Sequence, residues 1–184
     1  MPIDEEEVAS MRIIFLLAFA VLATAQTPKK APTPTGTNQP KFRGFVLNGK
    51  PEEQPDFTSC REQTCYAEAW DLDGARVSPR FYFVEERLMQ INGIFVSERF
   101  EGLKSILITK YGRPSGIENT NVQNGLGAKF VQQTVRWTGT SLSIYLRRYT
   151  DSREMGELEV LYKPYEDRKA LEAAKNRRAA VKSL

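Results

Sequence analysis

The chain has 184 residues, of which 41% are hydrophobic and 27% charged, and its formal net charge is +3. This length fits one domain, and the composition is that of an ordinary globular protein, which excludes a chain disordered throughout. The charge is mildly basic and favours anionic surfaces or partners, but it falls short of the basic excess of nucleic-acid-binding domains. We therefore expect no nucleic-acid partner.

An apolar run near the N-terminus predicts a signal peptide over residues 1–25. The run from Ile13 to Ala23 follows Arg12 and leads into Ala23-Thr24-Ala25, the small-residue pattern at which signal peptidase cleaves. It is shorter than the roughly 20 apolar residues of a permanent transmembrane helix. We expect cleavage before Gln26 and no stable membrane span afterwards, with a retained N-terminal anchor as the alternative. The protein would then be periplasmic or extracellular.

The segment ahead of the apolar run is acidic, with four carboxylate side chains before Met11. Acidic residues at this place oppose the usual orientation, in which positive charge stays inside. We therefore hypothesise that translation starts at Met11 and that residues 1–10 are a mis-called start. No cysteine directly follows the run, which excludes a lipid anchor on a thiol.

Residues 26–41 are predicted to be a flexible linker, because they combine repeated prolines with Thr and Lys and contain no apolar side chain larger than alanine. A folded domain is predicted over 42–164. The last segment, 165–184, is rich in Ala, Lys, Arg and Glu and predicts a basic helix. Its apolar face is thin, so we expect it to dock only in part.

Strand patterns dominate the first half of the domain. After a short candidate at Phe42–Leu47, the predicted strands are Cys65–Trp70, Phe81–Val84 and Leu88–Val96. The hairpin between the last two can turn at Glu85-Glu86-Arg87 or at Asn92-Gly93. We prefer the first position, because a turn at Asn92 leaves only a three-residue strand behind it.

A helix is predicted next, capped by Ser97, beginning near Glu98 and ending before Gly112 and Pro114. A polar loop is expected through Asn124. Three more strands follow, at 130–137, 142–149 and 156–162. The expected fold is therefore α+β, with two antiparallel three-stranded meanders, a helix between them and a C-terminal helix.

Cys60 and Cys65 are the two cysteines of the chain. In an exported protein, a close isolated pair most simply forms a disulfide. A redox role is disfavoured because the spacing is not Cys-x-x-Cys, and a metal role because further ligands are lacking.

Histidine is absent from the sequence. This excludes Ser-His-Asp and Cys-His nucleophile activation, and zinc sites that depend on imidazole. No other catalytic motif is recognisable, so we expect no enzymatic activity, no catalytic residues, no cofactor and no metal.

The best candidate for a protein-binding face lies on the strand at 142–149. Alternation places Tyr145, Arg147 and Tyr149 on one side, opposite the apolar side chains. Tyrosine and arginine are enriched in binding hot spots. An ordinary half-exposed strand face is the alternative. The basic C-terminal helix could lie against an anionic surface, although a solvated helix is the simpler interpretation.

One stretch carries a resemblance to known families. A strand hairpin leads into Phe100-x-x-Leu103-x-x-x-Leu107-x-x-Lys110-Tyr111-Gly112-x-Pro114, followed by strands that contain Trp137 and Ile144. Over roughly residues 77–162 the chain resembles a class of small exported bacterial proteins of unknown function. It is more loosely similar to the modules of BamE-like outer-membrane assembly lipoproteins and of β-lactamase inhibitor proteins. The chain departs from BamE by lacking a lipidated cysteine. The resemblance implies a non-enzymatic, protein-binding scaffold.

The leading expectation is therefore an exported binding or accessory protein of the bacterial envelope, with another envelope or secreted protein as its partner. The alternatives are an inhibitor of a secreted enzyme and a small hydrolase that uses carboxylates. The sequence leaves the oligomeric state open.

Overall fold

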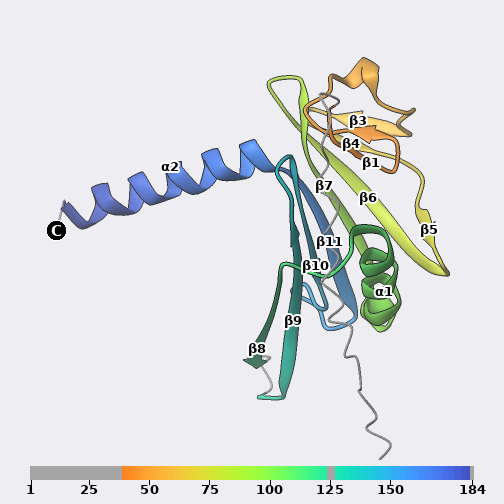
Figure 1. The fold of residues 1–184 in the computed structure, drawn as a ribbon, viewed down its shortest axis with the longest axis vertical. Helices are drawn as coiled ribbons and strands as arrows, with labels where there is room; N and C mark the ends of the chain where they lie inside the picture. The colour runs from red at the N-terminus through yellow and green to blue at the C-terminus, as the bar shows by residue number, and fades with distance from the viewer. Residues whose placement is uncertain (1–38, 124–126, 183–184) are drawn as a thin grey trace, which may run out of the picture.

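The computed structural model describes residues 39–123 and 127–182, so the predicted signal peptide and nearly all of the linker lie outside the described residues. The central element of the described chain is a nine-stranded antiparallel sheet (Figure 1). Its strands are β3 (Ser59–Arg61), β4 (Thr64–Tyr66), β5 (Trp70–Leu72), β6 (Ala75–Val84), β7 (Arg87–Val96), β8 (Gly116–Gln123), β9 (Lys129–Thr138), β10 (Leu142–Arg147) and β11 (Met155–Tyr162). A small sheet pairs β1 (Lys41–Phe42) with β2 (Phe45–Val46), and the α-helices are α1 (Phe100–Tyr111) and α2 (Lys163–Lys182).

The order of the large sheet is β3-β4-β6-β7-β11-β10-β9-β8, and β5 pairs separately with β6. Its central joint is the antiparallel pairing of β7 with β11, in register from Val96 opposite Met155 to Gln90 opposite Leu161. This pairing makes the expected α+β fold of two separate meanders wrong, because it merges both halves of the chain into one continuous sheet. Sequence adjacency predicts hairpins but carries no signal for a pairing between distant strands.

The hairpin of β6 and β7 turns at Glu85 and Glu86, and the predicted turn is confirmed. Both residues have positive φ, 50° and 59°, as the two-residue turns of twisted hairpins require. The rival position, Asn92-Gly93, lies inside β7. A Cβ on Gly93 would come within 2.5 Å of Cγ1 of Val77 on the neighbouring strand, so this glycine permits close packing rather than a turn.

One face of the sheet carries the hydrophobic core. The small sheet covers part of this face with aromatic side chains, and the ring centroids of Phe45 and Phe81 lie 4.1 Å apart. Helix α1 covers another part with Phe100, Leu103 and Leu107, all buried. The opposite face of the large sheet is polar and is called the open face below.

Helix α1 is confirmed close to its predicted bounds, but the role of Ser97 is not the expected one. A 3₁₀ turn, Ser97–Arg99, precedes the helix, and no side chain caps it at Arg99. The hydroxyl of Ser97 instead donates a hydrogen bond to the carbonyl of Arg153, at 2.6 Å. Ser97 therefore ties the start of the helix to the loop before β11.

The expected polar loop before residue 124 is wrong, because residues 116–123 form β8. This strand pairs with β9 without interruption, from Gly116 opposite Arg136 to Gln123 opposite Lys129. Nearly every side chain of β8 is exposed, so the strand lacks the apolar alternation by which strands are recognised. Main-chain pairing to β9 defines it instead.

The strand predicted at Cys65–Trp70 is also wrong as a single element, because β4 ends at Tyr66 and β5 begins at Trp70.

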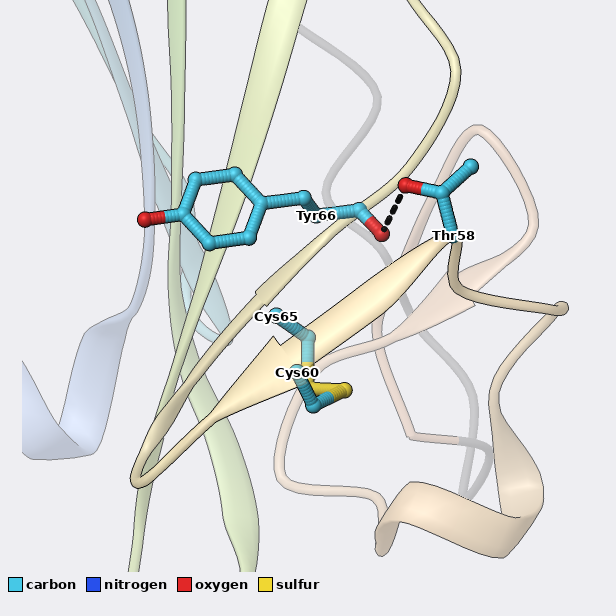
Figure 2. Close-up of a disulfide and its surroundings, with 4 residues drawn as sticks. All are labelled: Thr58, Cys60, Cys65 and Tyr66. Carbon is cyan, nitrogen blue, oxygen red and sulfur yellow. Dashed lines mark hydrogen bonds between the residues drawn. A yellow bond between two sulfur atoms is a disulfide. The ribbon is translucent and has the colours of Figure 1, made fainter.

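The predicted disulfide is confirmed. Cys60 of β3 lies directly opposite Cys65 of β4, with their Cα atoms 4.0 Å apart (Figure 2). Next to it, the hydroxyl of Thr58 donates to the carbonyl of Tyr66 at 3.1 Å. The disulfide thus closes the hairpin at one edge of the large sheet.

Helix α2 begins at Lys163, directly after β11, and projects away from the sheet (Figure 1). Its first turn packs against β10 and β11, whereas residues 167–173 are all exposed. The expected partial docking of this helix is confirmed.

Candidate functional site

Strand β10 divides its side chains as the alternation predicted. Ile144 and Leu146 point into the core and are fully buried, whereas Tyr145 and Arg147 lie half-buried on the open face. Ser143 belongs to the open face by alternation, but it is completely covered. The predicted strand ran to Tyr149, and this extension is wrong because β10 ends at Arg147.

Arg147 is held inside an ionic network. Across the pairing of β10 with β11, its guanidinium donates to the carboxylates of Glu157 and Glu159, at 2.8 Å for Glu159. Each carboxylate also accepts a bond from an amide on β7: Gln90 donates to Glu159 at 2.9 Å, and Asn92 donates to Glu157 at 2.5 Å. The network therefore spans the joint between the two halves of the sheet.

The electrostatics of Arg147 favour its charged form. Burial disfavours the charge, but the carboxylates of Glu159 and Glu157 outweigh burial and raise the pKa of Arg147 above its ordinary value. The side chains of Glu157 and Glu159 are mostly covered, with relative solvent exposures of 20% and 14%. Because one guanidinium holds both carboxylates, the pair is arranged for structural cohesion rather than for general acid-base chemistry.

Tyr145 anchors helix α2 through Glu166. The hydroxyls of Tyr145 and Ser143 both donate to this carboxylate, at 2.6 Å for Ser143. Lys163 lies 3.7 Å from the same carboxylate. Burial, and then the hydrogen bond to Glu166, raise the pKa of Tyr145 to about 12, although the nearby positive charge of Arg136 opposes this rise.

A hollow of about 140 Å³ lies beside Tyr145 on the open face, lined by residues of β8, β9 and β10: Gly116, Ile117, Glu118, Thr134, Arg136 and Tyr145. Arg136 is exposed, and within the described chain no carboxylate lies within 4.0 Å of its guanidinium. A Cβ on Gly116 would lie 3.3 Å from Nη2 of Arg136, so the guanidinium extends across β8 where a side chain is missing. The hollow therefore places an exposed guanidinium beside an aromatic ring, and the carboxylate of Glu118 lines the same hollow.

Tyr149 lies away from this hollow. Its ring meets Phe130 edge-on at 5.3 Å, and both its main-chain groups bond to the amide of Gln132. Arg153 lies over the ring of Phe130, 4.8 Å from its centroid. The structure thus brings Tyr145 and Arg147 together and gives Tyr149 separate partners near the β8–β9 hairpin.

Sequence reasoning missed Glu157, Glu159, Glu166 and Arg136. The first two alternate with Leu158 and Val160 along β11, a period-two pattern that places them on the polar face of a strand. Their convergence on Arg147 needed the register between strands, which the sequence does not contain.

No group of three or more acidic or cysteine side chains in residues 39–123 and 127–182 is arranged to hold a metal ion. Over the same residues, no helix has both the length and the apolar character needed to cross a membrane.

Comparison of the chain with protein-family models, with curated proteins and with solved structures finds no match.

Proposed function

We propose that the protein is an exported, non-enzymatic binding protein of the bacterial envelope, which engages another protein through the open face around Tyr145 and Arg136. The single observation that carries this proposal is the hollow in which the exposed guanidinium of Arg136 lies beside Tyr145. Arginine and tyrosine are the residue types most enriched in binding hot spots.

The surroundings of the hollow support a docking role. The ionic network of Arg147 and the bonds of Glu166 hold the strands and the first turn of α2 in fixed positions. A rigid surface loses little conformational entropy when a partner binds. The apolar run before residue 26 and the disulfide between Cys60 and Cys65 support export to an oxidising compartment.

The proposal changes the role expected for Arg147. Because this side chain is committed to Glu157 and Glu159, its removal disturbs the fold, and loss of binding in such a variant would not identify a contact. Arg136 is the better probe, since it is exposed and takes part in no ion pair within residues 39–123 and 127–182.

The test is chemical cross-linking of the tagged, mature protein in cells, with the partners identified by mass spectrometry. We expect one enriched envelope protein, and we expect Arg136→Glu to abolish its enrichment. Arg113→Glu is the matched control, because Arg113 is an exposed arginine outside the sheet. An enriched secreted enzyme would favour an inhibitor instead. Equal enrichment with wild type and Arg136→Glu would refute the proposed face.

A further inference from the structure

The two ends of the large sheet are protected differently. At one end, β3 has three residues, and the disulfide between Cys60 and Cys65 clips it to β4. Its hairpin carries charged side chains at Arg61 and Glu62. Short length, charge and covalent closure are all features that prevent an edge strand from pairing with another chain.

The other end, β8, lacks the short length and the covalent closure and carries little charge. It has eight residues, follows β9 in register without a bulge, and contains neither proline nor lysine. Glu118 is its single charged residue. Exposed apolar side chains of Ile117 and Val131 lie on the core-side face of the same two strands. A long, regular, weakly charged edge of this kind is a template for strand addition.

The outward main-chain groups of β8 can be assigned from its register. The carbonyl of Arg136 accepts a bond from the amide of Ser115, so it faces β8, and Arg136 lies opposite Gly116. Peptide groups alternate in direction along an antiparallel strand. Gly116 and every second residue after it therefore face β9, and the intervening residues face the free edge: Ile117, Asn119 and Asn121.

Arg136 adds side-chain selectivity to this edge. Its guanidinium lies 3.3 Å from the position of a Cβ on Gly116, on the open face. A strand added beside β8 would have one residue opposite Gly116, with its side chain on that same face. A carboxylate at this position can pair with this exposed guanidinium, which forms no ion pair among the described residues, whereas any larger residue in place of Gly116 would stand between them.

We propose that β8 binds an extended segment of the partner protein as an additional strand, with an aspartate or glutamate of that segment opposite Gly116. The inference rests on the proposed function, since the segment belongs to the protein that docks at the open face. Main-chain bonds supply the affinity, and Arg136 selects the acidic residue.

A second copy of the chain fits this edge less well. In a dimer with a twofold axis between two copies of β8, the open faces of both sheets lie on the same side. Residues that oppose each other across the axis therefore share a face, so both have even numbers or both have odd numbers. In the longest such registers, Gly116 lies opposite Val122 or beyond the end of β8. Neither register supplies a carboxylate to Arg136.

The test uses a displayed library of random peptides of about eight residues, the length of β8, selected on the mature protein and counter-selected on Asn119→Pro. Proline at this position removes an outward N–H and leaves pairing to β9 intact. Circular dichroism and thermal melting check the fold. If Asn119→Pro does not fold, a variant with Asn119→Lys and Asn121→Lys blocks the edge by charge.

We expect peptides that survive counter-selection to carry Asp or Glu at one fixed position and to bind Asn119→Pro about tenfold more weakly or worse. They should protect the outward amides of Ile117, Asn119 and Asn121 from hydrogen exchange. Replacing the Asp or Glu of the peptide by Asn or Gln should weaken its binding to wild type about three- to fivefold. The same replacement should leave binding to the Arg136→Gln variant unchanged.

Failure of the inference is distinguishable from failure of the proposed function. Loss of the cellular partner with Arg136→Glu, but not with Asn119→Pro, would keep the docking face and overturn strand addition. The inference would also be overturned if no peptide remained after counter-selection, or if the remaining peptides carried no Asp or Glu at a fixed position. A wild-type dimer that Asn119→Pro converts to a monomer would assign the edge to a second copy and overturn the partner segment.

Discussion

Gly156 of β11 lies directly opposite Phe95 of β7 and directly beneath its ring. A Cβ on Gly156 would lie 2.4 Å from Cζ of Phe95 and 2.9 Å from the carbonyl oxygen of Arg147. The absence of a side chain at Gly156 thus lets a core aromatic ring cross the joint between the two halves of the sheet.

Gly156→Ala is therefore expected to destabilise the protein by about 1–3 kcal/mol, because the added methyl group forces the ring of Phe95 to move within a packed core. Gly102→Ala is the matched control, since Gly102 lies in α1 with no atom within 4 Å of the added Cβ. There, alanine should stabilise the helix by about 0.5–1 kcal/mol. Urea denaturation measures both changes, and equal effects would contradict the role assigned to the joint.

Arg147→Met should destabilise the protein by about 3 kcal/mol, because it leaves two largely covered carboxylates facing each other without a cation. Lys50→Met removes an exposed pair and should change stability by less than about 1 kcal/mol. A loss at Arg147 as small as the loss at Lys50 would contradict the structural role assigned to the ionic network.

Two tyrosines should respond oppositely to removal of the hydroxyl. Among the described residues, the hydroxyl of Tyr111 is buried without a hydrogen-bond partner, so Tyr111→Phe should be neutral or stabilising. The hydroxyl of Tyr145 donates to Glu166, so Tyr145→Phe should destabilise by about 1–2 kcal/mol. Thermal melting of the two variants and of wild type measures both changes. A lower melting temperature for Tyr111→Phe than for Tyr145→Phe would contradict these hydrogen-bond assignments.

The same tyrosines predict a dependence on alkaline pH. Burial raises the pKa of each of Tyr111 and Tyr145 to about 12, above the ordinary value of 10.0. A pKa raised by folding contributes stability below pH 10, and this contribution is lost as the pH rises towards 12. The urea midpoint of wild type should therefore fall more steeply above pH 10 than that of the Tyr111→Phe, Tyr145→Phe double variant. Parallel curves would contradict the shifts.

Reduction of the disulfide should weaken the fold without abolishing it. The loop closed by Cys60 and Cys65 is short, so the chain-entropy model gives a loss of about 2 kcal/mol. The Cys60→Ser, Cys65→Ser variant should melt at a lower temperature and keep its circular dichroism spectrum. Wild type under reducing conditions serves as the comparison. Shifts in the NMR signals of the backbone amides of β8, at the opposite edge of the sheet, would contradict this local role.

The strongly alternating strands and the helix were predictable because each buries one face. Strands β6, β7, β9, β10 and β11 and helix α1 all show the period of their element in the sequence. Strand β8 was not predictable, because its side chains are exposed on both faces and only its pairing with β9 defines it. The pairing of β7 with β11, which decides the architecture, is a tertiary contact without a local signal.

The candidate site was predictable only in part. Alternation placed Tyr145 and Arg147 on one face, since the period of a strand is independent of its neighbours. Arg136 could not be singled out, because its importance arises from Gly116 on the adjacent strand and from its place beside Tyr145 of β10. Such features depend on the register between strands.

The pairing of β7 with β11 also determines the order in which the sheet can be completed. A chain that emerges from its N-terminus onwards has β7 well before β11, so the apolar side chains of Phe95 and Ile91 have no neighbour on that side until the last strand arrives. During that interval the hairpin of β6 and β7 is exposed to pairing with other chains. We therefore expect nascent protein to be most prone to aggregation just before Met155–Tyr162 becomes available.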